Sequence, residues 1–371
     1  FDFVFVDETQ DCDVAQLSLV MRSVKPGGRI IVVGDRRQSI YRWRGADSEA
    51  MPRMQKTLNA TMLPLYDSYR VTQCSAEEAR RVVPHFDTPR DEHGNSLAMP
   101  GICKEISAFE MLSMWNVGDT VISRQNKVMI PLAMKALRDR KIPYIMGDED
   151  QIPKALKSAL SKIIKSMGGN QSIDAFREAL IRWADAEREA VTKSVIDRRR
   201  DWERRMSKKW RGELDEGADE ELNYVKVGTI EDAFWNQDGT GLSQMPGIKN
   251  ANDLYAFIKE IAPTKSESSR EKKELTPEQF KAMLAQRILI TSVHRIKGGE
   301  GRRIFILEDT FKYNRGGLVT KQRLRPKEVT EEQNLWYVAV TRVKYERGNP
   351  AKGIPPRDGE LYYVYGLEDL I

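Results

Sequence analysis

The sequence predicts an α/β protein of more than one domain, and three observations lead to that prediction. Two short, apolar runs rich in residues that favour strands end at acidic residues: Phe3–Val6 ends at Asp7-Glu8, and Ile30–Val33 ends at Gly34-Asp35. Amphipathic helical patterns alternate with these runs, which is typical of parallel sheets. Residues 147–285 are mostly helical by period and rich in charge. A chain of 371 residues, 40% of them apolar, is large enough for two or three globular domains.

The first α/β pattern lies at the N-terminal end of the chain. Strands are expected at Phe3–Val6 and Ile30–Val33, and the apolar spacing over Val14–Met21 fits an amphipathic helix that ends at Pro26–Gly28. Strand, helix and strand at this spacing indicate a βαβ unit with parallel strands. The acidic residues that follow each strand would then lie at the carboxyl edge of the sheet, where α/β proteins bind ligands.

A second α/β pattern follows the polar stretch Thr88–Pro100, which we expect to be a loop or linker. Its expected strands are Val121–Ser123, Pro143–Ile145, Ile288–Ile290, Ile304–Leu307 and Leu361–Tyr365, and its expected helices are Lys127–Arg140 and Glu331–Val343. The pattern is interrupted by the helical stretch 147–285, which therefore resembles an insertion.

Two segments of this insertion stand out by composition. Arg182–Arg211 is dense in arginine and lysine, and it is either a solvated helix face or a surface that faces duplex DNA or a partner. Pro263–Pro277 is rich in serine, lysine and glutamate, and we expect it to be a loop.

Cysteine content, apolar runs and charge exclude several protein classes. Cys12, Cys74 and Cys103 are far apart and form no CxxC pair, so we expect neither a zinc site nor a disulfide framework, and a reducing cytoplasm fits. No apolar run approaches the ~20 residues of a membrane span, so we expect no membrane contact, and no signal peptide is recognisable. The net charge of +5 is compatible with a polyanionic partner.

Two polar segments directly follow the first two expected strands. In Asp7–Asp11, an Asp at a strand end can hold Mg²⁺ when phosphates complete its coordination shell, and the adjacent Glu8 can deprotonate a water. In Gly34–Ala46, arginines alternate with Tyr41 and Trp43. Aromatic rings beside guanidinium groups suit stacking on single-stranded bases, whereas a buried core or a plain turn would not need this mixture.

These segments and four later ones resemble, in the same order, the motifs of the UvrD/Rep family of superfamily 1 DNA helicases. DETQD at Asp7–Asp11 resembles motif II, and GDRRQSIYRWRGAD at Gly34–Asp47 resembles motif III. The further blocks are Tyr69-Arg70, resembling motif IV, Val121–Asn126, Ile290–Glu300, resembling motif V, and Glu331–Arg342, resembling motif VI.

The resemblance implies two RecA-like cores of the P-loop NTPase type, the first of them incomplete. Residues 1–100 would form the C-terminal part of the first core, and 101–146 together with 286–371 would form the second. Residues 147–285 would be a mainly helical insertion into the second core.

The resemblance also implies roles in binding ATP and Mg²⁺. Asp7 would coordinate Mg²⁺, Glu8 would be the general base, and Gln38 would contact the γ-phosphate. Arg70 and Arg342 would be arginine fingers, one from each side of the cleft, that stabilise charge on the transferring phosphoryl group. Tyr69 would stack on adenine and Glu300 would bind the ribose.

A second set of residues would bind DNA by the same resemblance. Tyr41 and Trp43 would stack on bases. Arg44, Arg124, Asn126, Ser292 and His294 would lie along the strand. For His294, a structural role within the fold remains an alternative.

The chain departs from the family in two ways. The family carries a GxGKT loop upstream of motif II that cradles the phosphates, and this sequence, which starts at the motif II strand, contains no such pattern. We therefore expect the first core to expose strand edges, and the chain alone to have negligible ATPase activity. Gly299 stands where the family usually has leucine, and Arg295-Ile296 is unusual before Lys297.

The leading hypothesis is an ATP-dependent 3′–5′ DNA helicase of repair, recombination or replication. It would act on single-stranded DNA and single/double-strand junctions, with repair or replication proteins as partners. The alternative is a non-catalytic module that binds single-stranded nucleic acid, or half of a split helicase. A helicase–nuclease subunit is a third hypothesis, which the lack of a carboxylate and lysine cluster after the last motif disfavours.

Overall fold

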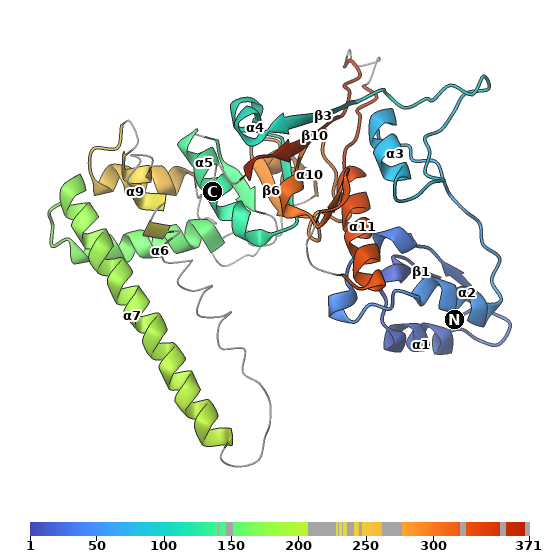
Figure 1. Ribbon diagram of the computed structural model, residues 1–371, viewed down its shortest axis with the longest axis horizontal. Coiled ribbons are helices and arrows are strands. Elements are labelled where there is room, and N and C mark those ends of the chain that lie inside the picture. Colours follow the sequence, from blue (N-terminus) through green and yellow to red (C-terminus); the bar gives the residue numbers. More distant parts are fainter. Residues whose placement is uncertain are drawn as a thin grey trace. The chain divides into compact units, whose positions relative to one another are not determined.

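The computed structural model describes the residues 1–139, 141–145, 151–206, 228, 230, 231, 233–235, 241–244, 247–261, 277–319, 324–348 and 354–367. The chain divides into two compact units. Unit 1 comprises 1–129, 144–146 and 281–371, and unit 2 comprises 130–143 and 147–280. The predicted α/β class is confirmed, because parallel strands alternate with helices in unit 1 (Figure 1).

The N-terminal end of unit 1 is the predicted βαβ element. Strands β1 (Phe3–Val6) and β2 (Arg29–Val32) pair in parallel, and α1 (Val14–Ser23) connects them. Helix α1 begins with a capping box, in which Asp13 accepts a hydrogen bond from the backbone of Gln16. A small core forms where α1 and α2 (Ala50–Leu58) meet the sheet, around Leu17, Ala50 and Met54.

The other face of this two-stranded sheet is apolar and exposed. Phe3 and Phe5 alternate on it with the inward-facing residues of β1, and both are exposed, as is Ile31 of β2. Within the described residues, β1 and β2 pair only with each other. The expected open strand edges are therefore present in this part of the chain.

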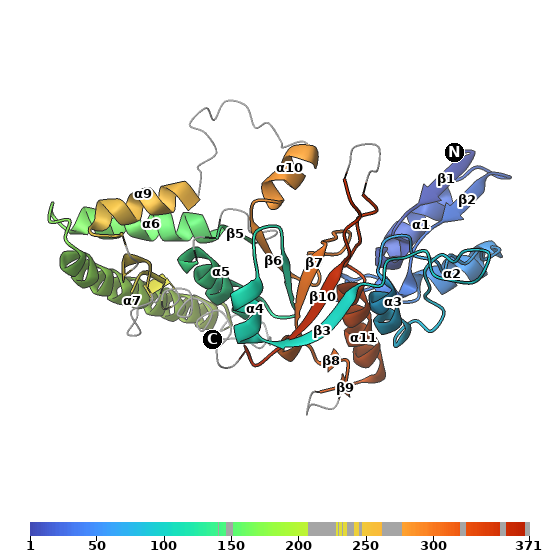
Figure 2. The ribbon, with the colours of Figure 1, turned by 90° about the horizontal axis from the view of Figure 1, so that it is seen from above.

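The main sheet of unit 1 has six strands in the order β3-β10-β7-β4-β6-β5 (Figure 2). The pairings of β3 with β10, β10 with β7, β7 with β4 and β4 with β6 are all parallel. The strands are β3 (Ile102–Ser107), β4 (Thr120–Ser123), β5 (Pro143–Ile145), β6 (Ile288–Ser292), β7 (Arg303–Leu307) and β10 (Glu360–Tyr365). Every residue of β4 and β6 is buried, as expected of central strands in a parallel sheet.

Two helices of unit 1 contact other elements of the same unit. Helix α11 (Pro326–Val340) contacts α3 (Gln73–Arg80), and α4 (Ala108–Met114) contacts β3. Unit 1 also contains the antiparallel hairpin β8 (Tyr313–Asn314) and β9 (Gly317–Leu318). Helix α5 (Met129–Arg138) belongs to unit 2 except for Met129, and α10 (Pro277–Leu284) is divided between the units at Lys281.

Unit 2 is helical in the residues described. Helices α6 (Gln151–Ser166), α7 (Ile173–Met206) and α9 (Ala251–Ile261) pack around a core that includes Leu160 and Phe176 (Figure 1). The basic run Arg182–Arg211 lies on α7 as far as Met206, and its last five residues are outside the described part. The predicted loop Pro263–Pro277 is also outside it, except for Pro277, which begins α10. No described helix has the length and apolar character needed to cross a lipid bilayer.

The expectation that the cysteines form no disulfide framework was wrong for two of them. Cys74 in α3 and Cys103 in β3 form a disulfide with a Cα–Cα distance of 5.9 Å, and Cys12 is free. The two residues are 29 positions apart in the sequence. Their proximity arises because α3 packs beside the edge strand β3, a long-range contact that cysteine spacing does not reveal.

Candidate functional site

The loop after β1 holds the first two predicted site residues at its exposed end. Glu8 has a left-handed backbone, with φ 50° and ψ 37°, and it precedes the short helix η1 (Thr9–Asp11). Its backbone N–H donates to Asp7 Oδ1 at 2.8 Å, and its carboxylate accepts a hydrogen bond from Gln10 Nε2. A positive φ is strained for glutamate, so the contacts of this loop hold Glu8 in an unfavourable backbone conformation while both carboxylate residues stay exposed.

The loop after β2 is organised by Asp35. This carboxylate caps η2 (Arg36–Gln38) by accepting from Arg37 N at 2.9 Å, and it also accepts from Gln38 Nε2 at 2.9 Å. A third hydrogen bond comes from the hydroxyl of Tyr337 in α11 at 3.0 Å. Asp35 thus fixes the side chain of Gln38 and joins its loop to α11.

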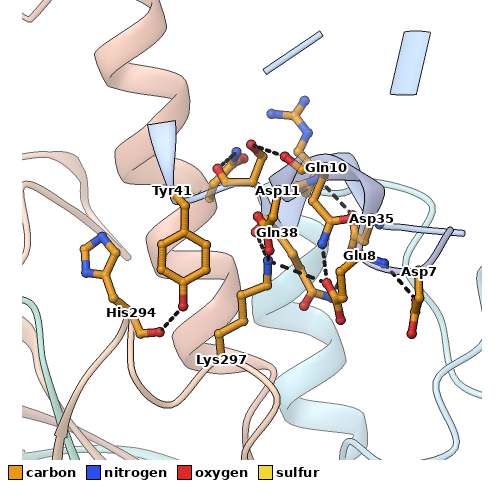
Figure 3. Close-up of polar contacts among 12 residues, drawn as sticks. Asp7, Glu8, Gln10, Asp11, Asp35, Gln38, Tyr41, His294 and Lys297 are labelled. Atoms are coloured by element: carbon orange, nitrogen blue, oxygen red, sulfur yellow. Dashed lines mark hydrogen bonds and ion pairs between the residues drawn. The ribbon is translucent and has the colours of Figure 1, made fainter. Parts of the chain in front are cut away.

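Lys297 connects the two loops (Figure 3). Its ammonium group donates to Gln38 O at 2.8 Å, forms an ion pair with Asp11, and lies 3.6 Å from Glu8 Oε2. The side chain is only 7% exposed, so these contacts are largely shielded from water. Burial raises the pKa of the Asp11 carboxyl, although Lys297 opposes the shift. Lys297 lies in the segment that resembles motif V, but the sequence analysis predicted no role for it.

Arg342 is buried directly after the C-terminal end of α11. Its guanidinium donates to Val338 O at 2.8 Å and to Thr341 Oγ1 at 2.9 Å, and the residue is 1% exposed. Within the described part of the chain, no carboxylate lies within ion-pair distance of it. Burial, and then the charge of Arg70, lower the pKa of Arg342 to about 10.

Arg70 lies beside the same helix end, which corrects one sequence expectation. Its Nη2 donates to Thr341 O at 3.1 Å, and its buried Nε has no hydrogen-bond partner among the described residues. The two arginines were expected on opposite sides of a cleft. They instead lie beside the same end of α11, because α3 and the segment before it pack against α11, and Ser75 Oγ donates to Val340 O at 2.6 Å.

A group of aromatic and basic residues follows Gln38. Trp43 is 68% exposed, and the guanidinium of Arg44 lies 5.0 Å from the Trp43 ring and 5.4 Å from the Tyr41 ring. The Tyr41 hydroxyl donates to His294 O at 2.6 Å, and Lys297 Nζ lies 5.3 Å from the Tyr41 ring (Figure 3). The Tyr41 side chain is therefore fixed by contacts with His294, Arg44 and Lys297. Most of the Trp43 side chain, in contrast, is exposed to solvent.

The other predicted DNA-binding residues differ in their surroundings. His294 is half-buried, and burial followed by the charge of Arg124 lowers its pKa to about 4. Arg124 forms an ion pair with Glu332 at 3.0 Å. Asn126 is exposed at the start of η4 (Asn126–Val128), and Ser292 is buried at the end of β6.

The predicted adenine and ribose contacts lie beside basic residues near the end of the chain. Tyr69 is 65% exposed, with the guanidinium of Arg347 at 5.9 Å from its ring. Glu300 Oε1 accepts from Lys344 Nζ at 2.6 Å. Both residues are exposed, so a ligand can reach them.

Comparison with known proteins identifies the family. Residues 149–346 match the model of the UvrD-like helicase C-terminal domain, which is more than half of the chain, and residues 1–59 match that of the UvrD/REP helicase N-terminal domain. The chain belongs to the UvrD-like helicase family.

Individual relatives of this UvrD-like chain match over a shorter stretch. It is 39% identical over 84 residues to the ATP-dependent DNA helicase PcrA of Bacillus subtilis (strain 168), covering 22% of the chain and 11% of that relative. The PcrA proteins of Leuconostoc citreum and Staphylococcus aureus (strain Mu50) are each 37% identical, over 86 and 84 residues, covering 23% and 22% of the chain and 12% of each relative. The matched stretch therefore spans about a ninth of these relatives.

Two of the residues that organise the site of the UvrD-like chain were missed by sequence reasoning. Asp35 and Tyr337 act through a contact between residues 302 positions apart, so no local pattern reveals it. The available signal was the presence of polar or basic residues, Asp35, Lys297 and Tyr337, inside three recognised motifs. Their presence in the motifs marks these residues as candidates for the site, but it does not show which of their side chains contact each other in the folded chain.

The donor set of the UvrD-like site fits Mg²⁺ held together with phosphate. No group of three or more His, Cys, Asp or Glu side chains in the described residues could hold a metal alone. Asp7 offers one exposed carboxylate whose Oδ1 accepts only the Glu8 backbone N–H among the interactions described. Mg²⁺ is commonly bound by one or two carboxylates and substrate phosphates, so this arrangement is compatible with it.

Proposed function

We propose that this chain contributes the ATP- and DNA-binding residues of an ATP-dependent helicase. The helicase moves 3′ to 5′ on single-stranded DNA, and acts at single/double-strand junctions in repair, recombination or replication. The observation that carries the proposal is the pair Arg70 and Arg342. A buried guanidinium without a carboxylate, beside a second guanidinium, is costly. A terminal phosphate that neutralises both charges gives the pair a function.

The loops after β1 and β2 supply the other residues of the proposed nucleotide site. Asp7 holds Mg²⁺, which when bound neutralises charge on the phosphates. Glu8 accepts the proton of the attacking water, and its strained backbone supports a functional reason for the loop conformation. Gln38, oriented by Asp35, contacts the γ-phosphate. Arg70 and Arg342 stabilise the charge that develops on the phosphoryl oxygens.

The nucleoside end of ATP lies at two exposed residues, each of which has a basic neighbour. Tyr69 stacks on the adenine and Glu300 binds the ribose hydroxyls. The exposed face of Tyr69 supports the first assignment. Glu300 would exchange or share its contact with Lys344.

Single-stranded DNA occupies the aromatic and basic group after Gln38. Tyr41 and Trp43 stack on bases, which contributes about 1–3 kcal/mol per base, and Arg44 lies along the strand beside them. A further set lines the strand: Arg124, Asn126, Ser292 and His294. Lys297 touches both the Gln38 loop and the Tyr41 ring, so it lies where a signal between ATP and DNA would pass.

We also propose the domain division that the motifs imply, with residues 147–285 as an insertion into the second core, and a cytoplasmic location. The PcrA relatives are named ATP-dependent DNA helicases. Since the matched stretch covers only a small part of them, activity, substrate and partners of this chain remain part of the proposal.

The test measures DNA-stimulated ATP hydrolysis and strand displacement. Hydrolysis also needs a loop that cradles phosphates, so turnover is assayed in a polypeptide in which a GxGKT-type loop precedes this chain. Duplexes with a 3′ or a 5′ single-stranded tail report the direction of movement. Displacement of the 3′-tailed duplex alone supports the proposal. DNA binding without turnover would favour a non-catalytic binding module instead.

In the same assay, Glu8→Gln is expected to lower kcat by about 100-fold or more, the contribution of a general base, while the Kd for ATP changes little. Glu49→Gln is the matched control, because Glu49 is an exposed carboxylate that pairs with Arg36 on the surface. Equal turnover in Glu8→Gln and Glu49→Gln would remove Glu8 from the mechanism.

A further inference from the structure

The disulfide joins the segment that carries Arg70 to the edge of the main sheet. Cys74 lies in the first turn of α3, four positions after Arg70, and Cys103 is the second residue of β3. The Cα–Cα distance of 5.9 Å is in the usual range for a disulfide. Both residues are half-buried, so small reagents in solution can reach them.

The two segments meet closely at this point even apart from the bond. Gly101 has a φ of +79°, and a Cβ placed on it would lie 2.4 Å from the Thr72 side chain and 2.8 Å from Cys74 Sγ. The Cys74 backbone N–H also donates to Pro100 O at 3.0 Å. These contacts keep the two thiols adjacent when the bond is reduced, so forming it requires little movement.

The same segment is the one that presents Arg70 to Arg342. Arg70 reaches Thr341 O through one hydrogen bond of 3.1 Å, and Ser75, in the first turn of α3, donates to Val340 O. Arg70 itself is only partly buried. Its position therefore depends on how firmly the start of α3 is held against the sheet and α11.

We propose that Cys74 and Cys103 form a reversible redox clamp whose oxidised state fixes the Arg70 segment beside Arg342, so that the thiol–disulfide state sets the affinity of the site for a triphosphate. The effect on affinity rests on the proposed function of the two arginines, whereas the clamp itself does not. The reduced protein keeps both arginines but holds Arg70 more loosely.

A low-molecular-weight disulfide such as oxidised glutathione supplies the oxidising equivalents. The Cys74 thiolate attacks one sulfur of glutathione disulfide and releases one glutathione thiolate. The Cys103 thiolate then attacks the Cys74 sulfur of the mixed disulfide and releases the second. Two protein thiols become one disulfide, and one glutathione disulfide becomes two glutathione molecules. The N-terminal end of α3 favours the thiolate of Cys74, which assigns it the first attack.

The experiment equilibrates the 371-residue chain in buffers of varied reduced to oxidised glutathione ratio. Alkylation followed by peptide mapping identifies the bonded cysteines, and hydrogen exchange measures the protection of residues 66–80. Affinity for inorganic triphosphate, the probe, is measured in both states by calorimetry. Cys74→Ser and Cys103→Ser each remove the bond, and Cys12→Ser is the matched control because Cys12 is free.

We expect the bond Cys74–Cys103 in the oxidised chain, slower exchange at 66–80, and triphosphate binding about tenfold tighter than in the reduced chain. That factor corresponds to ordering one further residue on binding. Both serine variants should bind like the reduced chain in every buffer, and Cys12→Ser should respond like the parent.

Three results would overturn the proposal. No Cys74–Cys103 bond at any glutathione ratio removes the clamp, and so does a bond that leaves exchange at 66–80 unchanged. Equal triphosphate affinity in the two states removes the effect on the site. If exchange slows on oxidation but neither state binds triphosphate, the clamp stands, and the phosphate role of the arginines fails together with the proposed effect on affinity.

Discussion

Arg342 carries its charge in a buried position that is unfavourable for the folded chain. Burial and the nearby Arg70 both lower its pKa, which means that they destabilise the charged form. Buried charges without a partner are costly in free energy, whereas Arg303, also in unit 1, is paired with the buried Asp119 at 2.7 Å. We therefore expect substitutions of Arg342 and of Arg303 to have different effects on the free energy of unfolding.

Replacing Arg342 with methionine is expected to leave the free energy of unfolding unchanged or raise it by about 1 kcal/mol. It should also weaken triphosphate binding by about tenfold or more, the value of a charge-assisted hydrogen bond. Arg303→Met, the matched control, should lower the free energy of unfolding by about 3 kcal/mol, because Asp119 is left unpaired. Urea unfolding and calorimetry measure both. A loss of stability in Arg342→Met as large as in Arg303→Met would mean that Arg342 is structural.

His294 predicts a dependence of stability on acid. Its pKa falls from 6.5 to about 4 on folding, first because of burial. Between pH 6.5 and 4 the unfolded chain takes up a proton that the folded chain does not, so the stability present above pH 6.5 decreases as the pH falls through this window. Urea unfolding at pH 7 and pH 4.5 should show a smaller decrease for His294→Gln than for the parent. His93→Gln is the control, since His93 is exposed. Identical decreases in parent and His294→Gln would contradict the burial of a neutral His294 imidazole in the folded chain.

The packing of Gly299 against Ile296 explains why both unusual residues of the motif V segment occur together. A Cβ on Gly299 would lie 2.8 Å from Ile296 Cδ1 and 3.1 Å from Ile296 O, and Ile296 is buried. Glycine at 299 therefore accompanies isoleucine at 296, and the turn that presents Lys297 retains its packing. The sequence alone shows the two departures but not that they compensate each other.

At the scale of elements, the site depends on loops that follow β1 and β2 and contact each other. Gln10 Oε1 accepts from Asp35 N at 3.1 Å, which joins the two loops. Gly34 lies at this junction, where an added Cβ would be 2.4 Å from Gln10 Oε1 and 3.1 Å from Met51 Sδ. A larger residue at 34 would require the Gln10 and Met51 side chains to shift, and the Thr9 backbone N, at 3.3 Å, leaves little room on the third side.

Gly34→Ala should therefore lower the free energy of unfolding by about 1–3 kcal/mol, the usual cost of overpacking. Gly316→Ala is the matched control. Its Cβ would meet nothing closer than 3.4 Å, and its φ is not positive, so its effect should stay within about 0.5 kcal/mol. Thermal or urea unfolding compares the two. Equal stability of both variants would show that the junction is not tightly packed.

The strands and helices differ in how well the sequence predicted them. The central strands β4, β6 and β7 are apolar runs, and they were predicted within a few residues because full burial leaves a strong pattern. β3 was missed because its middle, Lys104-Glu105, is polar and lies at the sheet edge. Helix α11 begins at Pro326 rather than Glu331, and proline in the first turn of a helix was the signal overlooked.

At the scale of the whole molecule, the order of motifs predicted the family and the α/β class, since each motif is a local pattern. What could not be predicted depends on packing between distant segments. The Cys74–Cys103 disulfide, the placement of Arg70 and Arg342 beside the same end of α11, and the contact of Tyr337 with Asp35 all join residues more than 25 positions apart. Such contacts exist only once the elements have packed.

The most direct test of the account is the affinity of the 371-residue chain for a fluorescent oligothymidylate, measured by anisotropy for the parent, Trp43→Ala and Phe109→Ala. Phe109 is an equally exposed aromatic residue, 77% exposed, on α4. The account predicts that the parent binds and that Trp43→Ala weakens binding by about tenfold, the loss of one base stack, while Phe109→Ala binds like the parent. No binding by the parent would contradict the proposed binding of single-stranded DNA by this chain, and equal affinity in all three would contradict the proposed stacking of Trp43 on a base.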